Sequence, residues 1–288
     1  MIKMETEEAK YAYMSPLSKT PRSVGHMIAI DTEDDTKGNM IIACLYGSYL
    51  KRTRKGKVVV KVDDTFYTRE ALNDFIHNLQ TPAQRFPACI LVGFNVAYDL
   101  AYIDEEVDYE TVIFGGSRFI SGTLKNGVDI IDIFNHGGGK SLDHWITELK
   151  MNEKGIYKTE WRKDLPLAEL VSHCQNDVRA HWEMAEFFRL TYKQIGVSFK
   201  LTTSSTALDL FKRKFFDGLM WKRKIDRFND REKEAYYGGR TEIFSRGIHR
   251  VKSYDINSAY VSAMSDGIYP KPDTARYNHA GTKRVRCD

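Results

Sequence analysis

The sequence predicts an α/β fold in which a mixed sheet is flanked by helices. Three apolar runs, over residues 25–31, 39–49 and 57–63, follow one another closely, as the strands of a meander do. Segments with helical and strand-like patterns then alternate along the chain. The longest helical pattern spans residues 165–190, where an apolar residue recurs every three or four positions.

The elements between the meander and the long helix are shorter. Apolar side chains form a helical stripe over residues 68–79, and Ser141 is placed to cap another helix. The full set expected here is helices over residues 68–79, 96–103 and 141–149 and strands over residues 88–93, 112–114 and 128–134. Farther on, we expect a capped helix with a basic flank over residues 202–216 and a strand over residues 251–260.

The chain divides into three parts by the types and the pattern of its residues. Residues 1–22 are polar, and we expect them to form a flexible arm. Residues 23–197 hold the alternating strands and helices and form the first domain. Residues 198–288 have a different residue pattern, and we expect them to form a linker and an incomplete second module.

The composition is that of a folded protein. Of the 288 residues, 42% are hydrophobic and 12% aromatic, which is enough for a core and excludes a disordered chain. The net charge of +4 is compatible with nucleic acid without identifying it. The basic residues cluster at 51–57, 212–224 and 283–286, and any single run reads first as solvated surface. The run at 51–57 also reads as the turn of a β-hairpin.

Cysteine usage indicates a reducing compartment. The four cysteines, at positions 44, 89, 174 and 287, lack C-x-x-C spacing, so we expect free thiols and neither disulfides nor a zinc site. The sequence shows no signal peptide and no apolar run that would span a membrane. We therefore expect an intracellular protein, in a host or bacterial cytoplasm, that is not secreted and has no membrane partner.

Three short acidic motifs stand in order along the chain, at residues 31–33, 95–99 and 173–177. Each lies inside or beside an apolar run, where a carboxylate is costly unless a positive group pairs with it. Together they offer four carboxylates: Asp31, Glu33, Asp99 and Asp177. Four such groups brought together would hold two divalent cations, Mg²⁺ or Mn²⁺, which is the equipment of a metal-dependent phosphodiesterase.

The same motifs resemble those of the 3′–5′ exonuclease domain of family-B DNA polymerases, a member of the DEDD exonuclease superfamily. Asp31-Thr32-Glu33 is similar to the first motif (D-x-E), and residues 95–99 match the second (N-x-x-F/Y-D). Residues 173–177 align with the third (Y-x-x-x-D), with His173 where that family usually has Tyr. The expected order of elements is that of the RNase H-like fold on which these exonucleases are built.

Further motifs extend the resemblance toward the protein-primed branch and over residues 25–270. Ser141 and Leu142 resemble the S/T-L motif that grips single-stranded DNA in these domains. Lys154 resembles the lysine motif of the protein-primed branch.

Two motifs of the polymerase part follow. The Y-x-G-G motif that joins the exonuclease and polymerase modules is matched by Tyr236, Gly238 and Gly239. Residues 255–260 resemble polymerase motif A, with Asp255 and Tyr260 at its conserved ends. The family's second polymerase acid and its lysine-bearing motif are not found before Asp288, so we expect the polymerase site to be incomplete in this chain.

The resemblance implies a role for each acid of the exonuclease motifs. Asp31 would bridge the two cations, Glu33 and Asp177 would hold the ion that generates hydroxide, and Asp99 would support the other ion. His173 shares a helix face with Asp177 and would orient the attacking water or act as a general base. A surface histidine is the structural alternative.

Other residues are assigned contacts with the substrate. Phe94 and Asn95 would contact the 3′-terminal nucleotide, Phe94 by stacking in a way that tolerates any base. Lys154 would stabilise the phosphate charge. Each also has a structural reading: Phe94 as a core aromatic, Ser141 as a helix cap, Leu142 as core, Lys154 as a loop lysine, residues 236–239 as a turn and Asp255 as a strand-end acid.

The leading hypothesis is a proofreading-type 3′–5′ exonuclease that acts on single-stranded DNA and belongs to a replicative family-B DNA polymerase. Its expected partners are single-stranded and primer–template DNA, with the rest of the polymerase or a terminal protein as further partners. One alternative is a stand-alone DEDD exoribonuclease, which would have no use for the motifs at 236–239 and 255–260. The other is an inactive DNA-binding remnant, which would have no reason to keep all four acids.

Overall fold

The computed structural model describes residues 11–14, 17, 25–35, 37–79, 89–158, 165–216 and 220–223. The chain divides into two compact units, Met1–Asp226 and Arg227–Asp288, and all described residues belong to the first. The expected strand over residues 251–260 and the whole second unit lie outside the described residues. Within the part described, no helix combines the length and the apolar character that crossing a lipid bilayer requires.

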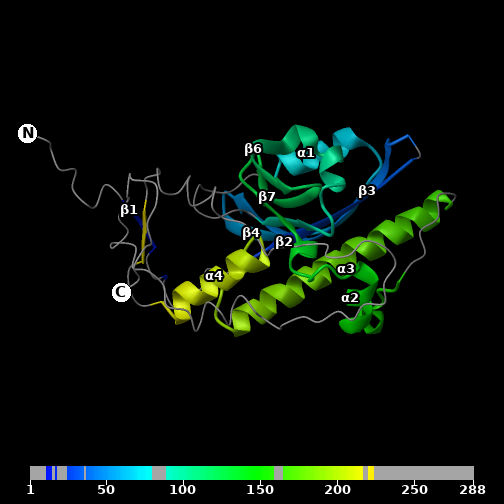
Figure 1. Cartoon of the computed structure of the whole chain (residues 1–288). Coiled ribbons are helices and arrows are strands. Elements are labelled where there is room, and N and C mark those ends of the chain that lie inside the picture. Colours follow the sequence, from blue (N-terminus) through cyan, green and yellow to red (C-terminus); the bar gives the residue numbers. More distant parts are fainter. Residues whose placement is uncertain are drawn as a thin grey trace, which may run out of the picture. The chain divides into compact units, whose positions relative to one another are not determined.

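A seven-stranded mixed sheet forms the centre of the first unit (Figure 1). Its strands, in spatial order, are β4 (Gly56–Phe66), β3 (Met40–Thr53), β2 (Met27–Asp34), β5 (Ile90–Gly93), β8 (Asp129–Asp132), β7 (Arg118–Leu124) and β6 (Val107–Gly115). The pairs β2–β3 and β3–β4 are antiparallel, which confirms the predicted meander. Strands β2, β5 and β8 run parallel, and β7 and β6 complete the sheet as an antiparallel hairpin.

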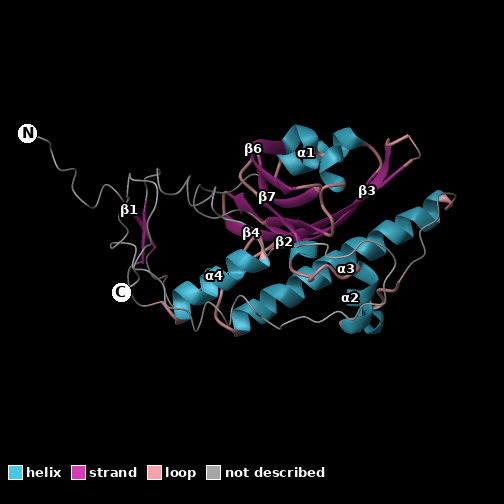
Figure 2. Ribbon diagram, in the orientation of Figure 1, coloured by secondary structure: helices cyan, strands magenta, loops and turns pink. Residues whose placement is uncertain are grey.

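Four α-helices accompany the sheet (Figure 2). They are α1 (Arg69–His77), α2 (Leu142–Glu148), α3 (Leu167–Gln194) and α4 (Thr203–Lys214). Short 3₁₀ helices lie at η2 (Asp99–Tyr102), η3 (Asp104–Glu106), η4 (Ile133–Asn135) and η5 (Met151–Lys154). Strands β1 (Tyr11–Met14) and β9 (Met220–Arg223) form a separate two-stranded sheet, so part of the segment expected to be an arm is a strand.

Two predicted elements differ from the structure. The helix expected over residues 96–103 is the short 3₁₀ helix η2, because the chain must turn sharply where β5 ends. The strand expected over residues 112–114 is one part of the longer hairpin β6–β7, and β7 was not predicted. The mixed α/β architecture was predicted correctly and is compatible with an RNase H-like fold.

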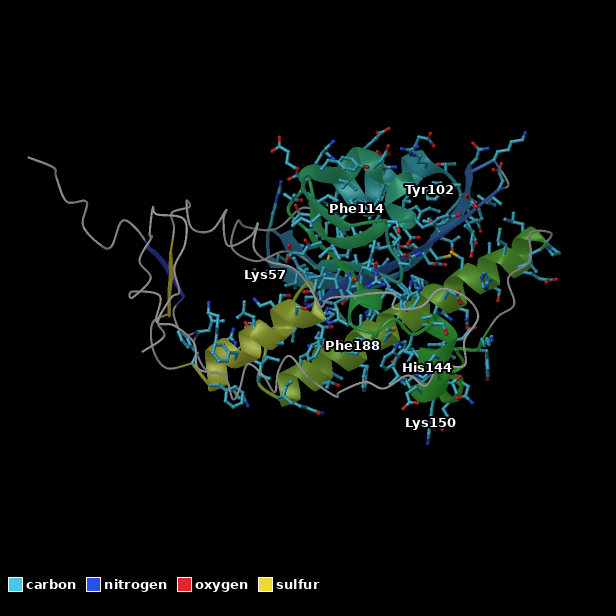
Figure 3. The ribbon with its side chains drawn as sticks, in the orientation of Figure 1. Lys57, Tyr102, Phe114, His144, Lys150 and Phe188 are labelled. Atoms are coloured by element: carbon cyan, nitrogen blue, oxygen red, sulfur yellow. The ribbon has the colours of Figure 1, made fainter. Side chains whose placement is uncertain are left out.

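The sheet separates two apolar layers. Alternation along β2 sends Met27 and Ala29 toward α3, and Ile28 and Ile30 toward the side of α1 and η2. Figure 3 labels Phe188 on the α3 side and Tyr102 on the other. Burial on both faces explains why the central strands read as continuous apolar runs.

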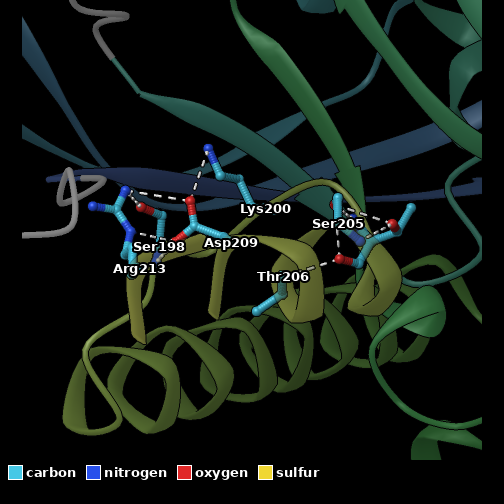
Figure 4. A network of polar contacts seen from close by, with 7 residues as sticks. Ser198, Lys200, Ser205, Thr206, Asp209 and Arg213 are labelled. Atoms are coloured by element: carbon cyan, nitrogen blue, oxygen red, sulfur yellow. Dashed lines mark hydrogen bonds and ion pairs between the residues drawn. The ribbon is translucent and has the colours of Figure 1, made fainter. Parts of the chain in front are cut away.

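Helix α4 is fixed to the loop that precedes it by a buried carboxylate. The side chain of Asp209 is 1% exposed and accepts hydrogen bonds from the Ser198 backbone N–H (3.0 Å) and from Arg213 Nε (2.6 Å). Lys200 Nζ lies 3.7 Å from the same carboxylate (Figure 4). Thr202 caps the helix, as its sequence predicted.

A buried histidine joins the segment after η4 to the end of α3. His136 Nε2 lies 3.0 Å from the Lys200 carbonyl oxygen, and Nδ1 lies 3.0 Å from the Tyr192 hydroxyl. Since a carbonyl oxygen only accepts, Nε2 carries the proton and Nδ1 accepts from the hydroxyl. Burial lowers the pKa of His136 to about 4, so the ring is neutral in the folded protein at neutral pH.

Strand β3 carries a glycine at the one point where a side chain cannot fit. Gly47 lies opposite Ile28 with φ +140°, and a Cβ atom there would lie 2.1 Å from the Met27 carbonyl oxygen. That oxygen belongs to the backbone of β2 and cannot move without breaking the strand pairing.

We predict that Gly47→Ala lowers the free energy of unfolding by more than about 3 kcal/mol, because strain and a backbone clash combine. Urea unfolding at pH 7 measures this. Gly56→Ala is the matched control, since Gly56 has φ +128° and open space around its Cβ position. It should cost only about 1 kcal/mol, and an equal cost for both variants would show that the clash is absent.

The neutral state of His136 predicts a pH dependence of stability. The folded pKa of about 4 lies below the unfolded value, so the unfolded chain takes up a proton first as the pH falls. The histidine therefore costs about 2 kcal/mol of stability between pH 7 and pH 5. Urea unfolding of His136→Gln should show a smaller loss over that interval than the wild type does. A loss in His136→Gln equal to that of the wild type would contradict the neutral, buried state of His136.

Candidate active site

Strand β2 carries two of the four predicted carboxylates on its α3 side. Asp31 lies opposite Cys44 of β3, and Glu33 follows two positions later on the same face of the sheet. The intervening Thr32 points to the other face. On the α3 side, the thiol of Cys174 lies 3.4 Å from the Asp31 carbonyl oxygen and donates to it.

The third carboxylate comes from the turn after β5. Gly93 ends that strand, and Asn95 takes a left-handed conformation with φ +59° that sends the chain into η2. Asp99 begins η2 and is 3% exposed. Its Oδ1 accepts a hydrogen bond from Thr32 Oγ1 at 2.8 Å, which fixes the turn to the end of β2.

Helix α3 supplies the fourth carboxylate and the histidine. His173 and Asp177 are four residues apart and share the face toward β2, as predicted. His173 Nε2 lies 3.4 Å from Glu33 Oε1 and 3.8 Å from Asp177 Oδ2. The structure thus brings together the acids of all three sequence motifs with a buried histidine between two of them.

Burial and mutual repulsion make the ionised carboxylates of this cluster unfavourable when no cation is bound. Burial raises the pKa of Asp31 well above its usual value, and the charges of Asp99, Asp177 and Glu33 raise it further. Burial also raises the pKa of Asp99 to about 8, against the opposing hydrogen bonds of Thr32. Asp31 Oδ2 is buried and accepts no hydrogen bond within the described residues.

The side chains offer the donor atoms that divalent cations prefer, but their present arrangement does not form a complete cation site. Carboxylate oxygens are the donors that Mg²⁺ and Mn²⁺ prefer, and the orphaned oxygen of Asp31 lies in the middle of the cluster. Within the described residues, no three His, Cys, Asp or Glu side chains surround a common point closely enough to hold a metal ion as they stand.

The predicted substrate aromatic packs within the protein on two sides. Phe94 is half-buried and meets Phe134 edge-on, with ring centroids 5.4 Å apart. It also stacks on His181, with centroids 6.0 Å apart and planes at 22°. Asn95 is exposed beside it. Both the core reading and the substrate reading of Phe94 are therefore compatible with its position.

Three residues near the acids were missed by sequence reasoning. Asp132 is fully buried and accepts from the Asn95 N–H (2.9 Å) and the Phe134 N–H (3.0 Å), so it holds the turn that carries Phe94. Burial raises its pKa to about 6. His181 Nδ1 lies 3.1 Å from the Ile30 carbonyl oxygen, and Thr32 holds Asp99. Only the i, i+4 spacing of His181 from Asp177 gave a signal in the sequence.

Of the remaining candidates, the structure describes Ser141, Leu142 and Lys154. Ser141 caps α2 by accepting from the His144 N–H at 3.2 Å, and Leu142 packs against the core on the α3 side. Lys154 is in an ion pair with Glu183, six residues along α3 from Asp177. The polymerase-motif residues Tyr236, Gly238, Gly239, Asp255 and Tyr260 lie outside the described residues.

The crowding of carboxylates predicts that removal of one charge stabilises the metal-free protein. In EDTA at pH 7, Asp31→Asn should raise the free energy of unfolding by about 1–3 kcal/mol, because a buried and repelled charge is lost. Urea unfolding measures the change. Asp64→Asn, at an exposed carboxylate of β4, should alter stability by less than about 0.5 kcal/mol. A less stable Asp31→Asn protein would contradict the mutual repulsion described above.

Comparison with known proteins identifies a family that matches part of this chain. The family described as DNA polymerase type B, organellar and viral, matches residues 138–285. The match covers more than half of the chain and includes Ser141, Asp177 and the second unit, whereas Asp31 and Asp99 precede it. No curated protein matches the chain. The chain belongs to the organellar and viral family of type B DNA polymerases.

Proposed function

We propose that the first unit is a metal-dependent 3′–5′ exonuclease of the DEDD type, which removes nucleotides from single-stranded 3′ ends of DNA. It would serve as the proofreading part of a DNA polymerase used in replication. The observation that carries the proposal is the convergence on Asp31 of three further carboxylates, Glu33, Asp99 and Asp177, so that three distant segments meet there. The buried Oδ2 of Asp31 lacks a hydrogen-bond donor within the described residues. Membership of the polymerase family indicates that the substrate is DNA, since the members of that family act on DNA.

The cluster is costly unless positive charge enters it. Asp31, Glu33, Asp99 and Asp177 would hold two Mg²⁺ or Mn²⁺ ions. When bound, the ions activate water and neutralise charge on the phosphate. The repulsion that raises the pKa of Asp31 then becomes attraction for the cations. The alternative of an inactive remnant gives no reason for an arrangement that is unfavourable without a ligand.

The reaction forms a bond between a water oxygen and the phosphorus of the terminal phosphodiester. The bond from phosphorus to the 3′ oxygen of the preceding nucleotide breaks, which releases a nucleoside monophosphate and leaves a shortened strand with a 3′ hydroxyl. His173, with Nε2 between Glu33 and Asp177, is placed to orient this water or accept its proton. It thus takes the position of the tyrosine usual in the family that the sequence resembles.

Contacts with the strand would come from the turn after β5 and from α2. Phe94 offers a ring face or edge to the terminal nucleotide, and Asn95 lies exposed next to it. Ser141 and Leu142 would line the path of the strand. Lys154 would support phosphate charge after exchanging its partner Glu183 for the substrate.

The second unit would supply the beginning of the polymerase domain. Tyr236, Gly238 and Gly239 would join the two activities, and Asp255 and Tyr260 would belong to the polymerase site. The family match reaches residue 285 and so includes all five positions. We assign the protein to the protein-primed branch, with primer–template DNA and a terminal protein as partners, because Lys154 and residues 236–239 follow that branch's motifs. The described cysteines are free thiols, which supports a reducing intracellular compartment.

Cleavage of labelled strands tests the proposal. With Mn²⁺, the wild-type chain should release mononucleotides from the 3′ end of single-stranded DNA. Asp31→Asn, Asp99→Asn and Asp177→Asn should each slow release by about 10²-fold or more, because cation binding and charge compensation fail. Rates are measured from the shortening of 5′-labelled DNA in denaturing gels.

Two controls separate the alternatives. Asp64→Asn and Asp255→Ala should cleave as the wild type does, because Asp64 is exposed on β4 and Asp255 belongs to the other site. RNA of the same sequence should be cleaved more slowly than DNA. Faster cleavage of RNA would indicate an exoribonuclease, and absence of release from both substrates would refute the enzymatic proposal.

A further inference from the structure

The hairpin of β3 and β4 extends past the rest of the sheet. Strand β2 pairs with β3 only as far as Gly47, whereas β3 and β4 remain paired up to Thr53 and Gly56. Residues 48–53 and 56–61 therefore form a ribbon of only two strands, here called the outer ribbon. Figure 3 labels Lys57 at this end of the sheet. At its inner end Tyr49 packs against Phe75 of α1, whereas residues 53–59 near the turn are exposed.

The outer ribbon, together with the turn residues 54 and 55 that join its strands, carries one of the three basic clusters of the chain. Residues 51–61 contain six lysines and arginines and no acid: Lys51, Arg52, Arg54, Lys55, Lys57 and Lys61. Since the whole chain carries only +4, the other 277 residues carry a net charge of −2.

Nothing within the described residues compensates this charge. The ion pairs there include none of Lys51, Arg54, Lys55, Lys57 and Lys61. Cations that crowd on one hairpin repel one another, which destabilises its paired strands. Val58 and Val59 are also 48% and 53% exposed among these cations. The isolated ribbon therefore carries a cost that an anionic partner would offset.

We propose that the outer ribbon binds the phosphate backbone of DNA at a distance from the carboxylate cluster. Asp31 lies opposite Cys44, and Lys51 is seven residues farther along β3, or about 23 Å at the rise of an extended strand. A duplex covers that distance in about seven base pairs. An anion that reaches both places must be a polymer, and a two-stranded β-ribbon fits the major groove of duplex DNA. DNA is also the substrate class of the family.

The test is the salt dependence of binding to a fluorescein-labelled 20-base-pair DNA, measured by anisotropy in EDTA between 50 and 200 mM KCl. Lys55→Gln/Lys57→Gln should make the negative slope of the log association constant against log salt concentration shallower by about 1.8, because two phosphate contacts are lost. At 50 mM KCl the Kd should rise by about 10-fold or more. A slope and Kd equal to those of the wild type would overturn the proposal.

A matched variant controls for net charge. Lys125→Gln/Lys193→Gln removes two exposed lysines outside the ribbon and should keep the wild-type slope. An equal fall of the slope in this variant would show a diffuse charge effect and also overturn the proposal. Poly-glutamate at equal charge concentration should compete poorly with the duplex, and equal competition would indicate an acidic protein as the partner instead.

The proposal is separable from the exonuclease function. Asp31→Asn should keep the wild-type salt slope, because the ribbon is intact. Cleavage of a trinucleotide, which is too short to reach from the carboxylates to Lys51, should proceed at the wild-type rate in Lys55→Gln/Lys57→Gln. A failure of cleavage in all proteins would refute the exonuclease and leave the binding test unaffected. A slower rate on the trinucleotide would contradict the remote location.

Discussion

The packing of α3 across β2 is the interaction on which the site depends. Two side chains of the helix contact carbonyl oxygens of successive residues of the strand: His181 reaches Ile30, and Cys174 reaches Asp31. These contacts fix the rotation and the height of α3 against the strand. Because they lie on one helix face with His173 and Asp177, they also place His173 between Glu33 and Asp177.

This arrangement makes the site a region of low intrinsic stability within a stable frame. Asp31 and Asp99 are almost entirely enclosed, and their charges repel one another at short range. The apolar layers on both faces of the sheet hold the backbone in place against that repulsion. Buried carboxylates that repel one another favour the entry of positive charge, because it relieves the repulsion.

The sequence was most informative where a local pattern coincided with a tertiary contact. The meander, the spacing of His173 and Asp177, and the Thr202 cap all follow from residues near one another in the chain. Strand β7 was missed, because its alternation is weak and its partners lie in other strands. The role of Asp132 was not predictable either, since its contact with Asn95 spans 37 residues and leaves no periodic signal. The turn of η2 depends on the same contact.

The outer ribbon is separable from the fold that carries it. Between Tyr49 and Val62, no described residue of the hairpin belongs to either core layer. Its backbone hydrogen bonds close between its own two strands. Removal of two residues from each strand would preserve both the pairing and the direction of every side chain. Evolution can therefore shorten, lengthen or exchange this hairpin as a module, independently of the residues that build the sheet.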